Sequence, residues 1–269
     1  MSILKDIQYK DSSKFNDRIY LHYKFGTNKY PLTQWVFDNI SKENNLKVLE
    51  LGCGNGLLWR LNAKRVPGTW EITLSDFSVG MIHDAKNTIG DSIKNITYEV
   101  INIEHIPFED HSYDLIIANN MLYHVPDRNK ALSEIQRVLK KNGTFYATTF
   151  SKYYMKEMKE IISEYRAKPV KENATNDLIQ NFSIEDGGEQ LKKYFNNIVL
   201  KPYDNILIIN EAEPFINFIY STVGIQRDKI IFNEDEREPL TEFVKNIIER
   251  KGNISIPANS GLFICKNSA

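Results

Sequence analysis

The sequence predicts an α/β fold with a doubly wound, mostly parallel sheet, and three observations support this prediction. Short apolar strands alternate with amphipathic helices over residues 47–150, an order typical of parallel strands joined by helices on both faces. The first strand runs into a glycine-rich turn, and the second ends on a carboxylate, Asp76. Because ligands of such sheets bind at the carboxyl ends of the strands, we expect the site there.

Local signals place the elements of this part in order. Pro67-Gly68 ends the helix after the glycine turn, Ser78 caps the next helix, and Asn142-Gly143 is expected to end the helix before the fifth strand as a C-cap. The predicted strands are 47–51, 70–75, 96–103, 113–118 and 144–150, and the predicted helices are 12–25, 31–44, 55–66, one that follows Ser78 as far as Ile89, and one with Ala131 to Leu139 on its apolar face.

The pattern changes after Phe150, where helices near 153–165, 185–195, 211–221 and 236–250 are interspersed with strands 198–200, 206–209 and 261–266. The polar stretch 167–181 is expected to be a loop or lid. We therefore expect an N-terminal helical lid (1–45), a core (46–152), and a helical cap with the closing strands of the sheet (153–269). Six cap side chains either line a pocket or pack the cap on the sheet: Tyr153, Tyr154, Met155, Phe215, Phe218 and Tyr220.

Composition argues against several classes of protein. The formal net charge of -1 disfavours an extended phosphate-binding surface, which needs a basic excess. Two cysteines, Cys53 and Cys265, predict reduced, buried thiols rather than a disulfide framework. Neither an apolar signal segment nor a membrane span is recognisable, and His105 and His111 lack metal-ligand spacing. We expect a cytoplasmic protein, monomeric or homodimeric, without a metal site.

The glycine turn, Gly52-x-Gly54-x-Gly56, is the feature most informative about function. It has neither the G-x-G-x-x-G spacing of a pyrophosphate site nor the Gly-Lys-Ser/Thr of a P-loop. Its glycines let the backbone approach a ligand closely. A carboxylate placed like Asp76, at the end of the second strand, accepts hydrogen bonds from ribose hydroxyls. The turn and the carboxylate together predict a nucleoside site without a phosphate cradle.

The segment Glu50-Leu-Gly-Cys-Gly-Asn-Gly56, with Asp76 at the right spacing, resembles the first motif of the class I S-adenosylmethionine-dependent methyltransferases. Residues 105–118, 122–127 and 134–143 are similar, in the same order, to stretches of the small-molecule branch of that family. The resemblance covers most of the first 150 residues. It implies a Rossmann-like sheet of seven strands, S-adenosyl-L-methionine as methyl donor and S-adenosyl-L-homocysteine as product.

The resemblance also implies cofactor contacts: Glu50, Gly52, Cys53, Gly54 and Asn55 in the turn around the methionine part, Asp76 at the ribose hydroxyls, Phe77 and Met81 beside the adenine, Asn102 and Ile103 at the adenine edge, and Asn119 near the methionine amine. Asn102 departs from the Asp of many relatives. Four alternative roles stay open: core packing for Met81, a loop anchor for Phe77, a turn residue for Asn119 and a helix-capping acid for Asp76.

Two further regions carry candidate roles. Relatives use an N-terminal helix as a lid, so Arg18 and Tyr23 are candidates to meet the cofactor carboxylate or the substrate, and a solvated helix face is the alternative. His124 follows the fourth strand, beside the expected methyl position, and an ordinary histidine pKa suits proton transfer near neutrality. We therefore expect His124 to act as the base when the acceptor carries a proton, and a structural loop role is the alternative.

The most favoured acceptor is a small molecule methylated on oxygen or nitrogen. The C-terminal half is similar in pattern to trans-aconitate and malonyl-carrier-protein methyltransferases, which leaves a carboxylate acceptor open. A tRNA or rRNA methyltransferase is the second reading. It predicts a basic stripe with interleaved aromatics near the site. The sequence offers a mildly basic stretch that glutamates interrupt, and a solvated helix face explains it better: Lys152, Lys156, Lys159, Arg166, Lys168 and Lys171. A protein that binds the cofactor without turnover is the third, because a cofactor motif reports binding and not chemistry.

Overall fold

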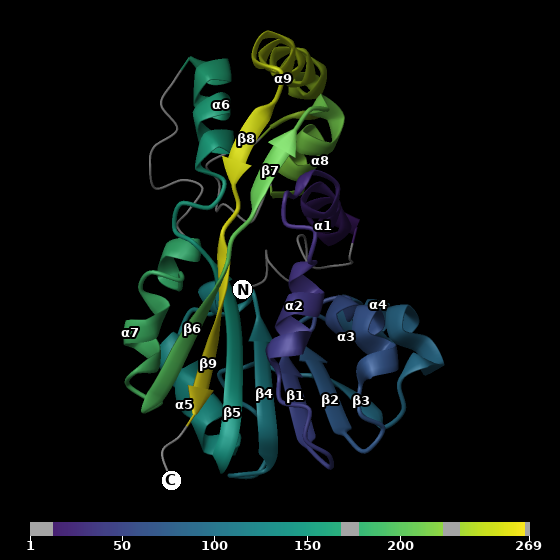
Figure 1. Ribbon diagram of the computed structural model, residues 1–269, viewed down its shortest axis with the longest axis vertical. Coiled ribbons are helices and arrows are strands. Elements are labelled where there is room, and N and C mark those ends of the chain that lie inside the picture. The colour runs from purple at the N-terminus through teal and green to yellow at the C-terminus, as the bar shows by residue number, and fades with distance from the viewer. Residues whose placement is uncertain (1–12, 168–177, 223–231, 267–269) are drawn as a thin grey trace.

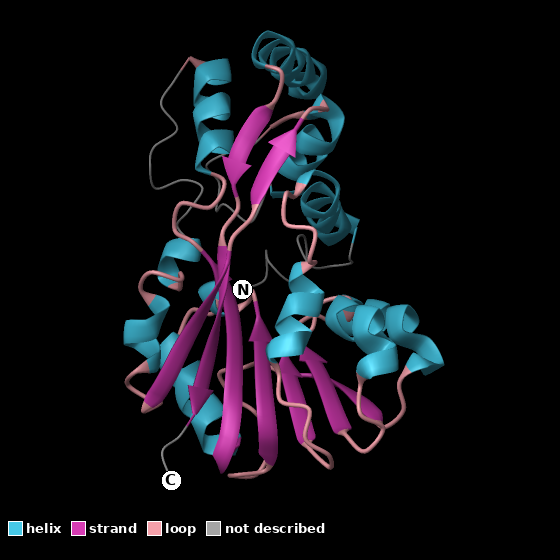
Figure 2. Cartoon of the chain, in the orientation of Figure 1, coloured by secondary structure: helices cyan, strands magenta, loops and turns pink. Residues whose placement is uncertain are grey.

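The computed structural model describes residues 13–167, 178–222 and 232–266. Their centre is a seven-stranded sheet with the strand order β3-β2-β1-β4-β5-β9-β6 (Figure 2). The strands are β1 (Lys47–Leu51), β2 (Glu71–Asp76), β3 (Ile96–Val100), β4 (Tyr113–Asn119), β5 (Leu139–Phe150), β6 (Asn197–Tyr203) and β9 (Ser260–Lys266). The first five pair in parallel, and β9 runs antiparallel to both of its neighbours. The predicted doubly wound, mostly parallel sheet of seven strands is confirmed.

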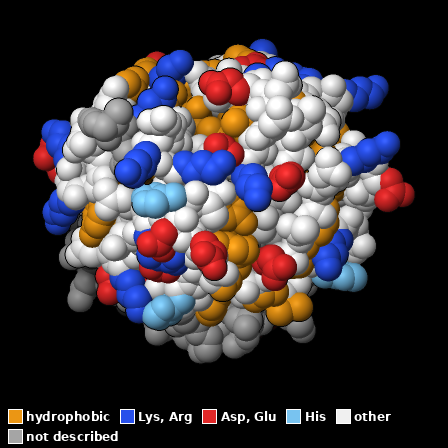
Figure 3. Space-filling view, turned by 90° about the horizontal axis from the view of Figure 1, so that it is seen from below, with side chains coloured by type: hydrophobic (Ala, Val, Ile, Leu, Met, Phe, Trp, Pro, Cys, Tyr) orange, Lys and Arg blue, Asp and Glu red, His pale blue; other side chains and the backbone are white. Residues whose placement is uncertain are grey.

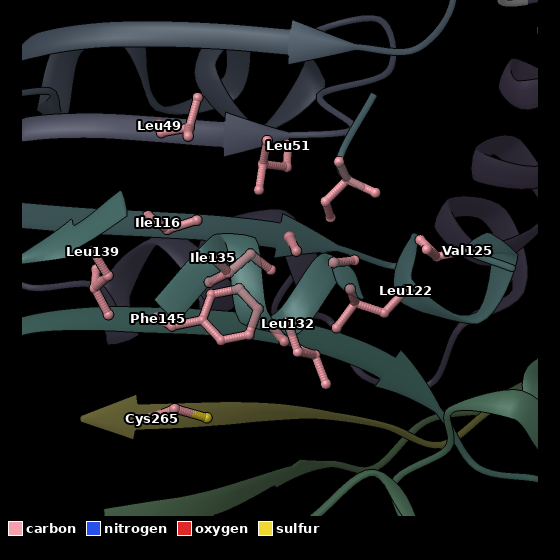
Figure 4. Packing of buried hydrophobic residues seen from close by; sticks show 14 of the residues in the cluster. Leu49, Leu51, Ile116, Leu122, Val125, Leu132, Ile135, Leu139, Phe145 and Cys265 are labelled. Carbon is pink, nitrogen blue, oxygen red and sulfur yellow. The ribbon is translucent and has the colours of Figure 1, made fainter. Parts of the chain in front are cut away.

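Helices cover both faces of the sheet, as the alternating sequence predicts. One face packs against α2 (Leu32–Asn39), α3 (Leu57–Asn62) and α4 (Val79–Ile89), and the other against α5 (Arg128–Val138) and α7 (Gly187–Leu191). Figure 4 shows the second layer, where Leu132 and Ile135 of α5 lie against Phe145 of β5. Both layers exclude water from the strands, so the sheet is a rigid frame whose carboxyl ends hold their loops in place.

A second core lies above the carboxyl ends of the parallel strands (Figure 1). Beyond the sheet, β6 leads into β7 (Ile206–Ile209), and β8 (Ile254–Pro257) leads into β9. The strands β7 and β8 pair with each other in antiparallel fashion. The chain between them forms α8 (Ala212–Thr222) and α9 (Arg237–Lys251), and α1 (Ser13–Phe25) and α6 (Lys156–Arg166) complete this cap. Its buried apolar cluster combines Leu21 and Phe25 of α1 with Phe215 of α8 and Val244 of α9.

Short 3-10 turns connect these elements: η2 (Ala63–Arg65), η3 (Gly90–Ser92), η4 (Leu122–His124), η5 (Ile179–Asn181) and η6 (Glu234–Glu236). The two predicted N-terminal helices take different places. The first, α1, packs in the cap cluster, whereas α2 packs on the sheet through Val36 and Phe37. Most of the predicted loop at 167–181 lies outside the described residues.

Several predicted boundaries were wrong, among them three in the first 150 residues. The helix before the fifth strand ends at Val138, and not at Asn142-Gly143, because Leu139 already pairs with Tyr113 in the sheet. Gly143 instead lets the strand pack tightly, since a Cβ there would lie 2.7 Å from Leu139 Cδ1. The second helix ends at Asn39 rather than 44, and β3 ends at Val100 rather than 103. The strand β8 was not predicted.

Candidate active site

A cavity of about 1080 Å³ lies between the carboxyl ends of the strands and the cap. The loops after β1, β2 and β4 line one side of it, and α1, α6 and α8 line the other. Every residue that the sequence singled out as a site residue lines this cavity: Arg18, Tyr23, Glu50, Gly52, Cys53, Gly54, Asn55, Asp76, Phe77, Met81, Asn102, Ile103, Asn119 and His124. The volume exceeds that of most single-ligand pockets, about 300–1,000 Å³, so it accommodates two ligands side by side.

The glycine turn requires glycine at two positions for two different reasons. Gly52 has a φ of +73°, and a Cβ there would lie 3.0 Å from the Met121 side chain. Gly56 has a φ of +75°, and its Cβ would lie 2.8 Å from Ile89 Cδ1 of α4. Left-handed backbone carries a steric penalty for residues with a Cβ. The first glycine therefore shapes the cavity floor, while the third serves the packing of α3 against α4.

Asp76 connects the glycine turn to the start of α4. Its Oδ2 accepts a hydrogen bond from the Gly54 N–H at 3.0 Å, and its Oδ1 accepts one from the Ser78 N–H at 2.9 Å. Ser78 in turn caps α4 by accepting from the Met81 N–H. Burial raises the pKa of Asp76, and the backbone hydrogen bonds act in the opposite direction. Asp76 thus holds the turn in shape and also presents its carboxylate to the cavity.

Glu50 lies beneath the turn and joins three strands. Its Oε2 accepts from the Trp59 indole N–H at 2.5 Å, and its Oε1 accepts from Asn119 Nδ2 at 2.8 Å. The Thr148 hydroxyl then donates to Asn119 Oδ1 at 3.2 Å. Burial raises the pKa of Glu50 to about 7, with a smaller contribution from the Asp76 charge. The network fixes Asn119, which the sequence analysis placed near the methionine amine, at the end of β4.

Two side-chain oxygens beside the turn have no hydrogen-bond partner within the part of the chain that the structure describes. They are Oδ1 of Asn55 and Oδ1 of Asn120, and both are buried and belong to residues that line the cavity. The Asn55 amide nitrogen is occupied, because Nδ2 donates to Asn16 Oδ1 at 3.1 Å and so ties the turn to α1. Buried acceptors are normally satisfied, so the cavity is built to receive donors here. The sequence analysis did not single out Asn16 or Asn120.

The end of the cavity beyond β2 and β3 is mainly apolar. Met81 and Ile103 are buried, and Phe77 is 38% exposed. Asn102 folds back, since its Oδ1 accepts from the Glu104 N–H at 3.0 Å. Cys53 is also buried here, and burial raises the pKa of its thiol well above the ordinary value, so it is a neutral wall residue.

At the cap end, Arg18 and His124 lie close enough to interact electrostatically. Nη1 of Arg18 donates to the Ser221 carbonyl of α8 at 3.1 Å. Burial lowers the pKa of His124 to about 3, and the Arg18 charge contributes to this shift. His124 is therefore neutral at neutral pH, the form that accepts a proton, although its pKa is not the ordinary one assumed from the sequence. Tyr23 is 80% exposed and lies at the rim.

The cap adds residues that the sequence analysis noted without assigning. Tyr154, Met155 and Phe218 line the cavity, whereas Phe215 is fully buried in the cap cluster and Tyr153 is 61% exposed. His22 of α1 also lines the cavity, where its Nε2 lies 2.6 Å from the Tyr154 hydroxyl. Helical spacing in the sequence shows which face of α1 turns inward, but it does not reveal a partner 132 residues away.

The described ranges contain neither a cluster of metal-ligating side chains nor a membrane-spanning helix. Within residues 13–167, 178–222 and 232–266, no group of three or more His, Cys, Asp or Glu side chains is placed to hold a metal ion. Over the same ranges, none of the helices has the length and apolarity needed to cross a membrane.

A family model described as a methyltransferase domain matches residues 42–198, more than half of the chain. The chain belongs to the class I S-adenosylmethionine-dependent methyltransferases. The matched part of this methyltransferase contains the glycine turn, Asp76 and His124, but not α1 or most of the cap. The resemblance predicted from the motifs is thereby confirmed.

Individual relatives resemble the methyltransferase over part of its length. The ubiquinone/menaquinone biosynthesis C-methyltransferase of Hydrogenovibrio crunogenus is 35% identical over 107 residues, which are 39% of this chain and 42% of that protein. The chain thus spans about half the length of the curated C-methyltransferases that it matches.

Two solved structures share the fold at low identity. The BH2331 protein of Bacillus halodurans C-125 is 16% identical, with a TM-score of 0.61 over 88% of this chain and 99% of that one. Phosphoethanolamine N-methyltransferase 2 of Haemonchus contortus, solved with S-adenosyl-L-methionine, is 19% identical, with a TM-score of 0.58 over 99% of this chain and 60% of that one. At such identities the similarity establishes the fold of the methyltransferase alone.

Proposed function

We propose that the protein transfers a methyl group from S-adenosyl-L-methionine to an oxygen or nitrogen of a small molecule, and that both ligands bind in the cavity between sheet and cap. The observation that carries this proposal is the continuity of the cavity. It runs from the glycine turn and Asp76, past the end of β4, to His124 and the cap. A donor held at the turn and an acceptor held under the cap would therefore meet at the end of β4.

The residues around the turn fit a cationic nucleoside. Asp76 offers a carboxylate suited to ribose hydroxyls, and the unsatisfied oxygens of Asn55 and Asn120 suit an ammonium group. Phe77 and Met81 offer apolar surfaces for the adenine. The cofactor supplies a methyl group on a positively charged sulfur, which is already an activated leaving group. The protein must then mainly position the acceptor in line and exclude water.

We propose that α1 and the cap perform the exclusion of water, and that His124 takes the proton from an acceptor that carries one. His124 is neutral above about pH 5 because its pKa is lowered to about 3. A neutral imidazole has a lone pair that accepts a proton, but a pKa of about 3 makes His124 a weaker base than an ordinary histidine, so we expect a contribution at the low end of the about 10²–10⁴-fold that positioned bases give. An acceptor atom that is already ionised needs no base, and His124 would then only orient it.

The charge distribution supports a small acceptor over RNA. Within the basic stretch of α6, Lys156 lies 3.6 Å from Glu160, and Arg166 lies 3.6 Å from Glu236. Lys168 and Lys171 lie outside the described residues. At the end of the molecule away from the cap, Lys and Arg side chains are mixed with Asp and Glu (Figure 3). A nucleic-acid surface needs positive charge concentrated along one face, and these pairs do not supply it.

Incubation with methyl-labelled cofactor and pools of small hydroxylated or amino compounds tests the proposal. We expect labelled product that Asp76→Ala abolishes and that His124→Asn reduces by up to about 10²-fold for a protonated acceptor. The site of the label on the product distinguishes oxygen and nitrogen from carbon. Cofactor binding without transfer to any pool would favour the non-catalytic reading. Transfer to tRNA or rRNA alone would favour the nucleic-acid reading.

A further inference from the structure

The cap end of the cavity contains a continuous set of aromatic side chains, which we call the aromatic wall: Tyr123, Phe150, Tyr154, His22 and Phe218. Consecutive ring centroids lie 6.2, 4.2, 5.7 and 6.3 Å apart. The Phe150 and Tyr154 rings are stacked at 25°, and the Tyr154 and His22 rings at 7°. The wall begins in η4, just past the carboxyl end of β4, and reaches α8 in the cap.

One polar pair interrupts this wall. His22 Nε2 and the Tyr154 hydroxyl lie 2.6 Å apart, and they come from α1 and from the segment that leads into α6. Burial lowers the pKa of His22 to about 4 and raises the pKa of Tyr154. Both groups are therefore uncharged at neutral pH. Tyr154 is then not a base, because its proton is held too tightly, and the role that fits the pair is recognition.

The pair selects a particular polar group. If Tyr154 donates to His22, the tyrosine oxygen can still accept a hydrogen bond from a ligand. If His22 donates to Tyr154, the tyrosine O–H can donate to a ligand. A hydroxyl group satisfies either arrangement because it both donates and accepts. A neutral carbonyl or ether satisfies only the second arrangement, and the first is favoured because an imidazole nitrogen accepts a hydrogen bond more strongly than a phenol oxygen does.

We infer that the cap end of the cavity is a subsite for a planar, hydroxylated molecule of the phenol class, with its ring against Phe150 and Tyr154 and its hydroxyl on the His22–Tyr154 pair. Aromatic rings gain about 0.5–1.5 kcal/mol from stacked or edge contacts beyond the area they bury. The subsite adjoins His124, whose ring centroid lies 4.5 Å from that of Tyr123. The inference depends on the proposed function only in treating this molecule as the methyl acceptor.

Binding of four matched probes tests the inference without requiring turnover. The probes are 2-naphthol, 2-methoxynaphthalene, decahydro-2-naphthol and 2-naphthoate, and calorimetry gives the Kd of each with free protein and with its S-adenosylhomocysteine complex. We expect 2-naphthol to bind about tenfold more tightly than the methoxy probe, the fold-change that one well-made hydrogen bond gives. We also expect it to bind more tightly than the saturated probe. Equal affinities, or tightest binding of 2-naphthoate, would overturn the inference, and the latter would assign the subsite to an anion near Arg18.

Two conservative variants and a neighbouring control separate recognition from folding. Tyr154→Phe and His22→Phe should reduce the preference for 2-naphthol over 2-methoxynaphthalene to near unity while binding of the methoxy probe persists. Tyr153→Phe, at an adjacent residue that is 61% exposed, should keep the full preference. Retention of the preference in Tyr154→Phe would contradict the inference. If the cofactor product binds but naphthol does not, this inference fails while the proposed function stands. If naphthol binds but no methyl transfer occurs, the proposed function fails alone.

Discussion

At the scale of single residues, two carboxylates, the buried Glu50 and the half-buried Asp76, organise the glycine-turn end of the cavity. Asp76 holds two backbone N–H groups, and Glu50 holds an indole and an amide. The sequence predicted both residues as site residues from the motif. It did not predict their hydrogen-bond partners, because the contacts to Trp59 and Asn119 depend on how α3 and β4 pack. It also assumed an ordinary pKa for His124, which burial and Arg18 alter.

The raised pKa of Glu50 predicts a pH-dependent stability. The pKa is about 7 in the folded protein against 4.5 as the ordinary value, so the unfolded chain loses this proton at lower pH. Stability from this group is therefore fully present below pH 4.5 and is lost as pH rises through 7, by about 3 kcal/mol. Glu50→Gln has no such proton, so its stability relative to wild type should rise by about that amount between pH 4.5 and 7.5. Urea unfolding at several pH values measures this, and a pH-independent difference would contradict it.

The lowered pKa of His124 predicts how activity depends on pH. With a pKa of about 3, the imidazole stays neutral from pH 8 down to pH 5.5. The ratio of kcat/KM for wild type to that for His124→Asn should therefore be constant over this range. An ordinary pKa of 6.5 would instead make the ratio fall about tenfold at pH 5.5. Taking the ratio cancels the titration of Glu50, which both proteins share, and the acceptor used is one that does not titrate over this range.

At the scale of elements, local patterns predicted most helices and strands of the core, because residue propensities, the spacing of apolar residues and the turn and capping residues all indicate the same elements there. The boundary at Leu139 was missed because the strand pairs with β4 earlier than the Asn142-Gly143 signal suggests. Strand β8 was missed because Ile254–Pro257 is short and includes a serine and a proline, whereas the equally short β7 is a continuous apolar run, Ile206–Ile209. It is stabilised by pairing with β7, to which only the fold brings it close.

The glycine turn offers a test at this scale. Gly56→Ala places a Cβ 2.8 Å from Ile89 Cδ1 at a φ of +75°, so it combines backbone strain with overpacking. We expect a loss of about 2–4 kcal/mol in the free energy of unfolding. Gly68→Ala is the matched control, since nothing lies within 4 Å of its added Cβ, and it should change stability by less than about 0.5 kcal/mol. Equal effects of the two substitutions in urea unfolding would refute this role of Gly56.

At the scale of the whole molecule, the site arises where two separately packed cores meet. The sheet and its helices form one core, and α1, α6, β7, α8, α9 and β8 form the other. The sequence predicted the first from its regular alternation and the second only as helices of unknown arrangement. The Arg18–Ser221 and His22–Tyr154 contacts join residues 203 and 132 positions apart. No local pattern encodes such contacts, so the cap end of the cavity could not be predicted from the sequence.

The proposed methyl transfer depends most on a nucleoside site at the glycine turn. Calorimetric titration with S-adenosylhomocysteine tests it directly, with wild type, Asp76→Ala, Asp76→Asn and, as a control at an exposed position, Asp91→Ala. We predict saturable binding by wild type and Asp91→Ala, and at least about tenfold weaker binding by both Asp76 variants, because charge-assisted hydrogen bonds contribute about 1.5–3 kcal/mol. Folded wild-type protein that fails to bind, or Asp76 variants that bind as tightly as wild type, would contradict the placement of the cofactor at this turn.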